Sequence, residues 1–211
     1  MQNNLFPKLQ DYCQSLPEEF ALIPADRQEK LKEIGDFILK HQKEETIAQL
    51  NIICTHNSRR SHMGMLWLKT AALYYGIEQV ETFSGGTEGT AFNPRAVASL
   101  QRAGIEIKKE KDGDNPIYSV KMEAKMAPLK LFSKKYSHEM NPQKDFCAVM
   151  VCSDADEACP IVFGASKRVA IPYEDPKAFD NTDLEAQKYD ERSRQIAREM
   201  FFVVNYVKEQ L

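Results

Sequence analysis

The chain has 211 residues, enough for one domain with a substantial hydrophobic core. Hydrophobic residues make up 43% and charged residues 28%, as in an ordinary soluble globular protein. The net charge of −3 argues against a nucleic-acid partner, and no apolar stretch approaches the roughly 18 residues that span a bilayer. Five cysteines, an odd number, favour a reducing compartment, and we expect the cytoplasm.

Strands and helices are expected to alternate along most of the chain. The expected strands are short apolar runs bounded by polar residues, at 48–53, 80–83, 105–107, 146–151 and 168–171. The expected helices have apolar residues at helical spacing or begin at capping signals, at 26–41, 61–75, 93–103 and 182–211. This alternation predicts an α/β fold with a parallel sheet.

We divide the chain into two parts. Residues 1–45 are mostly polar and contain one amphipathic pattern, so we expect a helical N-terminal extension. Residues 46–211 are expected to form the α/β domain, with an insertion at about 108–145 to which we assign no elements. Thr182 and Glu185 stand three apart at the start of the last helix, which predicts a capping box there.

A Cys-x5-Arg motif lies between the first buried strand and the following helix. Cys54 and Arg60 are its ends, and Ser61 follows directly. A loop of this length aims successive backbone N–H groups at one point, and the helix N-terminus adds positive potential. Arg60 supplies a planar fork for two oxygens, and the same field favours the thiolate of Cys54. We expect a tetrahedral oxyanion to be bound by Thr55, His56, Asn57, Ser58, Arg59, Arg60 and Ser61.

The alternative interpretation is a small buried cysteine at a strand end with a solvated arginine nearby. A bare Cys-x5-Arg is common by chance. The strand before the motif, the helix after it and the serine beside the arginine favour an oxyanion site with Cys54 as nucleophile.

The loop resembles that of the low-molecular-weight tyrosine phosphatases and of the thioredoxin-coupled arsenate reductases that share their fold. Asn57 falls where the family has an asparagine that supports the loop. The run from Ser84 to Thr87, followed by Asn93-Pro94, is similar to the Ser-Ala-Gly-Thr and Asn-Pro segments of the arsenate reductases, with Ser84 as a further support. His56 and Arg59 stand where a glycine and a second cysteine are usual.

The resemblance covers about residues 48–107 and 145–207. It implies a central four-stranded parallel sheet flanked by helices. The Glu174-Asp175-Pro176 segment resembles the family's general-acid loop, which implies that Asp175 protonates the leaving group. Asp-Pro is also an ordinary start of a turn, so this role depends on the resemblance.

The segment from Cys152 to Cys159 resembles the redox segment of the arsenate reductases. The resemblance implies that Cys54 attacks arsenate, that Cys152 then forms a disulfide with Cys54, and that Cys159 takes over Cys152 for reduction by thioredoxin or a similar thiol reductant. The spacing of Cys152 and Cys159 permits a disulfide between them only if the segment between them leaves a helical conformation. Two buried structural cysteines are the alternative. A zinc site is disfavoured by the spacing, and we expect no metal and no cofactor.

The primary hypothesis is therefore an arsenate reductase. The first alternative is a low-molecular-weight tyrosine phosphatase that hydrolyses phosphoesters through a phosphocysteine at Cys54. The second is a non-catalytic oxyanion-binding module, against which Cys54, Arg60 and Asp175 argue together, because a binder needs neither a nucleophile nor an acid. In each case the expected ligand is a small oxyanion or a phosphoester.

Overall fold

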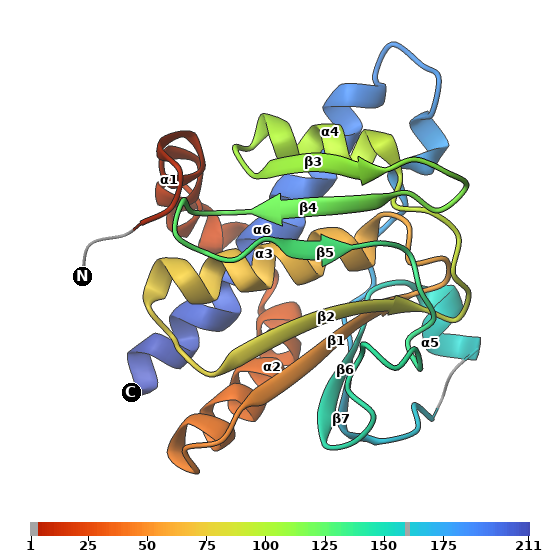
Figure 1. Ribbon diagram of the computed structural model, residues 1–211. Helices are drawn as coiled ribbons and strands as arrows, with labels where there is room; N and C mark the ends of the chain where they lie inside the picture. The colour runs from red at the N-terminus through yellow and green to blue at the C-terminus, as the bar shows by residue number, and fades with distance from the viewer. Residues whose placement is uncertain (1–3, 159–160) are drawn as a thin grey trace.

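The structure is a computed structural model that describes residues 4–158 and 161–211. Its centre is a four-stranded parallel sheet, as predicted, and the strand order is β2-β1-β6-β7 (Figure 1). The strands are β1 (Ala48–Cys54), β2 (Val80–Gly86), β6 (Phe146–Met150) and β7 (Ala165–Ala170). β1 and β6 are buried almost throughout because each lies between two neighbours in a sheet that is covered on both faces.

Three long helices cover one face of this sheet, and the short α5 lies on the other side (Figure 1). The long helices are α2 (Ala25–Lys43), α3 (Arg60–Tyr75) and α6 (Glu185–Gln210), and α5 is Ser153–Ala158. α4 (Pro94–Arg102) packs against α6, and the side chain of Asn93 caps it by accepting the N–H of Arg95 over 2.9 Å. No helix among the described residues is long and apolar enough to cross a membrane.

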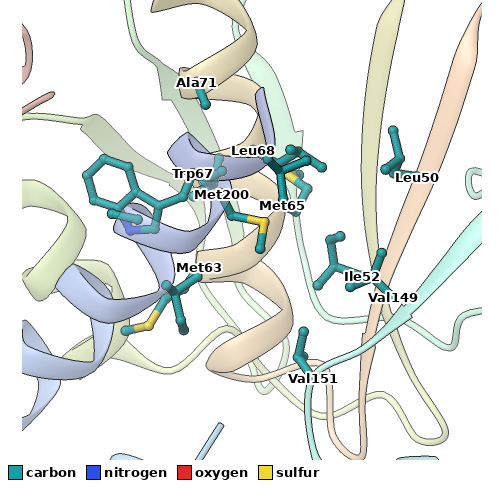
Figure 2. Packing of buried hydrophobic residues seen from close by; sticks show 14 of the residues in the cluster. Leu50, Ile52, Met63, Met65, Trp67, Leu68, Ala71, Val149, Val151 and Met200 are labelled. Atoms are coloured by element: carbon teal, nitrogen blue, oxygen red, sulfur yellow. The ribbon is translucent and has the colours of Figure 1, made fainter. Parts of the chain in front are cut away.

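The core between α3, α6 and the sheet is made of large apolar side chains (Figure 2). Ile52 of β1 faces α3, and Gly64 allows the helix to approach, because a Cβ there would lie 2.9 Å from Ile52 Cγ2. On the other side of α3, Trp67 is fully buried and donates its indole N–H to Ser193 of α6 over 2.9 Å. Each fully buried large apolar side chain contributes about 1.5–3 kcal/mol, so α3 is fixed firmly behind the loop that precedes it.

The N-terminal region is helical, as predicted, but it is not a separate extension. It consists of α1 (Pro7–Gln14), the 3-10 helix η1 (Pro17–Leu22) and α2. Its apolar side chains are fully buried in the same core as the sheet, namely Leu9, Leu16, Leu31, Ile34 and Ile38. The apolar side of α2 packs against α6 and the sheet. The N-terminal helices are therefore part of the α/β domain.

The insertion forms a second sheet, which the sequence did not predict. Its three antiparallel strands are β3 (Glu106–Lys111), β4 (Ile117–Lys121) and β5 (Leu129–Leu131), so the strand expected at 105–107 belongs here. After β5 the chain runs along the end of β2, where the N–H of Gly86 donates to the Lys134 carbonyl over 3.0 Å. The insertion therefore reaches the loop after β1.

The predicted capping box of the last helix is wrong. α6 begins at Glu185 after Leu184, which makes no side-chain cap. Thr182 instead donates its hydroxyl to the carbonyl of Phe179 over 2.8 Å, at the end of the 3-10 helix η2 (Pro176–Phe179). The preceding turn therefore uses the hydroxyl that the cap would have needed.

Candidate active site: the loop after β1

The loop from Cys54 to Arg60 lies at the carboxyl end of the central strand, the edge where open α/β sheets bind ligands. Cys54 is the last residue of β1, and α3 begins at Arg60. Between them is a small pocket of about 10 Å³, lined by Cys54, His56, Ser58, Arg59, Arg60 and Asp175. The sheet and α3 thus bring a thiol, the start of a helix and an arginine to one point.

The Cys54 thiol is almost completely buried and contacts one hydroxyl. Its Sγ atom lies 3.0 Å from Ser61 Oγ. Ser61 Oγ also accepts a hydrogen bond from Asn57 Nδ2 over 2.9 Å. Because Asn57 is the donor in that bond, the hydroxyl hydrogen of Ser61 is free to point at the sulfur. A donor aimed at sulfur stabilises a thiolate.

Asn57 holds the loop in shape from below. Its φ of 45° lies in the left-handed region, which asparagine tolerates better than most residues. Its side chain is fully buried, and Oδ1 accepts the backbone N–H of Lys134 over 2.8 Å. The next contact along the loop is also from the insertion, because Ser133 donates its hydroxyl to the carbonyl of His56 over 3.0 Å. The segment that follows the second sheet therefore supports the loop after β1.

Arg60 and Asp175 form an ion pair at the pocket. Arg60 Nη2 lies 2.9 Å from Asp175 Oδ2, and Arg60 Nη1 donates to the carbonyl of Tyr173 over 2.8 Å. Asp175 also caps η2, since its Oδ1 accepts the N–H of Lys177 over 3.0 Å. The structure therefore brings together the arginine and the acid that the sequence placed 115 residues apart.

The fold has close counterparts among solved structures. A low-molecular-weight phosphotyrosine phosphatase from Vibrio cholerae O395 matches 77% of this chain and 98% of its own, with a TM-score of 0.51 and 13% identity. One from T. tengcongensis matches 78% and 99%, with a TM-score of 0.52 and 14% identity. This chain has the low-molecular-weight phosphotyrosine phosphatase fold.

Sequence relatives of this phosphatase-fold chain carry a different name. An "Arsenate reductase 2" from Staphylococcus epidermidis is 27% identical over 124 residues, which is 59% of this chain and 75% of the relative. An arsenate reductase from Bacillus subtilis strain 168 is 27% identical over 142 residues, 67% and 84% of the two chains. No protein-family model matches. The resemblance seen in the sequence is confirmed, as is the prediction that this phosphatase-fold chain is an enzyme.

Arg59 lines the pocket and also contacts side chains outside the loop. Its Nε donates to the Tyr189 hydroxyl over 2.7 Å and its Nη2 to Asp180 Oδ2 over 3.2 Å. Its charge is thus paired with Asp180, its Nε also lies 3.8 Å from Asp175 Oδ1, and it ties the loop to α6 and to the turn after η2. Asp180 and Tyr189 were missed in the sequence because nothing in their spacing links them to the loop.

The other loop residues have distinct surroundings. The side chain of His56 is 51% exposed, with Nε2 3.9 Å from Glu88 Oε2, while Ser58 lines the pocket. Thr55 points its hydroxyl toward a second thiol, with Oγ1 3.4 Å from Cys152 Sγ. The main chains of the two segments are also hydrogen-bonded just before these residues, because the N–H of Val151 donates to the Ile53 carbonyl over 2.9 Å. Cys152 therefore lies beside the loop.

The four cysteines among the described residues form two groups. Cys54 and Cys152 are free thiols at the ends of adjacent strands. Cys13 and Cys147 are buried elsewhere in the core, and burial raises the pKa of each thiol to about 12, which makes them inert near neutral pH. Cys159, the third predicted redox residue, lies outside the described residues.

A buried histidine beneath the loop was not singled out in the sequence. His62 follows Ser61, is completely buried, and stacks on Phe92 with ring centroids 4.1 Å apart. Ser84 Oγ lies 3.2 Å from His62 Nδ1, so Ser84 contacts the loop region through this imidazole. Burial, and then the charge of Lys134, lowers the pKa of His62 to about 3, so the ring is neutral at neutral pH.

Proposed function

We propose that this protein reduces arsenate to arsenite, with Cys54 as the nucleophile and Cys152 as the second thiol. The observation that carries the proposal is the 3.4 Å contact between Thr55 Oγ1 and Cys152 Sγ. It brings a free thiol to the loop that begins at Cys54, which a redox-neutral hydrolase does not need. The arsenate reductases among the sequence relatives support the same reaction.

Oxyanion binding begins with an exchange of partners at Arg60. The pocket is almost filled while Asp175 pairs with the guanidinium, so an entering arsenate takes the place of the carboxylate. The backbone N–H groups of the loop and the N-terminus of α3 then bind the remaining oxygens. Asp175, displaced but still beside the anion, takes a proton from the entering dihydrogen arsenate and returns it to the departing hydroxide, which leaves as water.

The redox chemistry balances with two thiols. Cys54 thiolate attacks arsenic, and water leaves, which gives a sulfur–arsenic bond with arsenic still at its higher oxidation state. Cys152 then attacks the Cys54 sulfur. The electron pair of the sulfur–arsenic bond stays with arsenic, which departs as arsenite, and a Cys54–Cys152 disulfide remains. The two electrons delivered to arsenic are those lost by the two thiols.

Regeneration uses Cys159 and an external dithiol. Cys159 attacks Cys152, which frees Cys54 and gives a Cys152–Cys159 disulfide for thioredoxin or a similar reductant. The helix α5 occupies the stretch between the two cysteines. Six helical residues rise about 9 Å, beyond the limit of about 7 Å between bridged Cα atoms, so α5 must unwind for this bond to form.

A phosphatase is the second candidate, and the position of Asp175 favours it. Hydrolysis of a phosphoester needs a nucleophile, an arginine and an acid, and Cys54, Arg60 and Asp175 meet at one pocket. On this hypothesis Cys152 protects Cys54 by forming a reversible disulfide.

Steady-state assays distinguish the two candidates. Arsenate turnover is measured with thioredoxin, thioredoxin reductase and NADPH, beside hydrolysis of p-nitrophenyl phosphate by the same preparation. The reductase proposal expects sustained NADPH oxidation that depends on both arsenate and thioredoxin. Hydrolysis of the aryl phosphate without any arsenate-dependent NADPH oxidation would replace it with the phosphatase.

A further inference from the structure

A buried ion pair joins the N-terminal helix α2 to α6. Arg27 Nε donates to Glu199 Oε1 over 2.8 Å, and the Glu199 side chain is only 1% exposed. The other carboxylate oxygen, Oε2, accepts the hydroxyl of Tyr173 over 2.7 Å. The guanidinium of Arg27 also lies over the Tyr173 ring, 4.7 Å from its centroid. The ring of Tyr173 is therefore held from two sides, by α2 and by α6.

The direction of the Tyr173 hydrogen bond is fixed by its environment. Burial, and then the charge of Glu199, raises the pKa of the Tyr173 hydroxyl well above its ordinary value. The phenol is thus protonated at neutral pH and donates to the carboxylate. The Glu199 carboxylate accepts strong hydrogen bonds from Arg27 and from Tyr173. A carboxylate that is buried needs such partners to offset the loss of its hydration.

The backbone of the same tyrosine reaches the Cys54 pocket. Its carbonyl accepts Arg60 Nη1 over 2.8 Å, and its N–H donates to the Val151 carbonyl over 3.1 Å, one residue before Cys152. Asp175 follows two residues later and pairs with Arg60 Nη2. Tyr173 is thus the point at which the buried pair and the oxyanion loop are connected.

We propose that Arg27 and Glu199 are positioning residues for the oxyanion site, which act by fixing Tyr173 and, through its carbonyl, the guanidinium of Arg60. The inference rests on the proposed role of Arg60 as an oxyanion ligand. With Nη1 held by the carbonyl, the guanidinium fork keeps one orientation when Asp175 leaves. Bidentate recognition depends on that orientation, and a small displacement of the fork weakens it.

A second ion pair between the N-terminal helices and α6 provides a matched control. Arg194 of α6 binds Glu19 of η1, with Nη2 2.7 Å from Oε1, and its side chain is 24% exposed. The other partners of Arg194 are Ser15 Oγ and the carbonyl of Tyr12, which are also N-terminal. This pair fastens the same two parts of the chain but contacts none of the loop residues.

The test measures oxyanion binding without turnover. Iodoacetamide alkylation of Cys54 is followed by peptide mass mapping, and inorganic arsenate is titrated to find the concentration that half-protects the thiol. The proteins are wild type, Tyr173→Phe, Glu199→Gln and the control Arg194→Gln, with the melting temperature of each recorded. Tyr173→Phe removes one hydroxyl and keeps the ring on Arg27, so it carries the comparison if Glu199→Gln does not fold.

We expect Tyr173→Phe and Glu199→Gln to raise the half-protecting arsenate concentration about 5–10-fold, the scale of one strong hydrogen bond. Arg194→Gln should stay within about twofold of wild type while losing a comparable amount of thermal stability. Equal shifts in Tyr173→Phe and Arg194→Gln, or none in Tyr173→Phe, would overturn the inference. If arsenate protects Cys54 of the wild-type protein from alkylation but is not reduced, the reductase proposal is refuted. The comparison of the variants would still test the positioning role.

Discussion

Lys134 donates its backbone N–H to Asn57 Oδ1 over 2.8 Å, and this bond joins the segment after the inserted sheet to the loop that begins at Cys54. Asn57 must accept it from a left-handed backbone conformation, with φ at 45°. The same side chain donates to Ser61 Oγ. One residue thus sets the loop's shape, its link to the insertion and the orientation of a hydroxyl at the sulfur.

Asn57→Ala should destabilise the protein more than Asn57→Gly. Both variants lose two buried hydrogen bonds, which costs about 1–3 kcal/mol. Alanine also has to adopt the left-handed conformation, which costs about 1 kcal/mol more. Urea denaturation of the two variants measures the difference. Equal stability, or a more stable alanine variant, would show that the left-handed conformation is not imposed on residue 57.

The cysteine variants separate a reductase from a phosphatase. Cys152→Ser should abolish arsenate turnover, because one thiol cannot supply two electrons. Cys159→Ser should stop repeated turnover with thioredoxin but leave a single round, detectable as one arsenite per enzyme. Both should keep any aryl phosphatase activity, which Cys54→Ser should lose. If Cys152→Ser and Cys159→Ser both turn over arsenate with thioredoxin at the wild-type rate, the relay is refuted.

Ser61→Ala should slow alkylation of Cys54 at neutral pH by about tenfold, the scale of losing one hydrogen bond to a charged group. The cause is the loss of the hydroxyl 3.0 Å from the sulfur. Thr70→Val is the control, because it also removes a buried hydroxyl from α3, one that among the described residues bonds to the Leu66 carbonyl alone. Iodoacetamide kinetics with peptide mapping give the rate at Cys54. An equal rate in Ser61→Ala and Thr70→Val would rule out the hydroxyl's effect on the thiol.

The buried His62 should make the protein sensitive to acid. Its pKa is about 3 in the folded state, against 6.5 for the ordinary group. As pH falls below about 6.5 the unfolded chain binds a proton that the folded protein does not, so this contribution is complete above pH 6.5 and is lost toward pH 3.

Between pH 6.5 and pH 5 the loss should be about 2 kcal/mol, since one pKa unit corresponds to about 1.4 kcal/mol. Urea denaturation at a series of pH values measures it. His62→Gln, which cannot titrate, should show a flatter dependence over this range even if it is less stable at pH 7. A His62→Gln profile parallel to that of wild type would assign the acid sensitivity to other groups.

The parallel sheet and the position of the loop follow from the amino-acid sequence alone. The mainly apolar runs at 48–53 and 146–151 are the two central strands, because strands covered on both faces are rich in apolar residues. Cys54 and Arg60 are linked by one short loop between a strand and a helix, so their proximity is a local property of the chain.

The distant residues that meet at that loop are known from the three-dimensional packing and not from the sequence. Arg59 is hydrogen-bonded to Asp180 and Tyr189, and Arg60 to Tyr173 and Asp175. In each case the two partners are more than 110 residues apart in the sequence. Polar side chains such as these carry no periodic signal, because their partners depend on how the helices and the sheet pack. For the same reason the insertion could not be assigned. Its strands are short, β3 is mostly polar, and the three strands are held by pairing with one another.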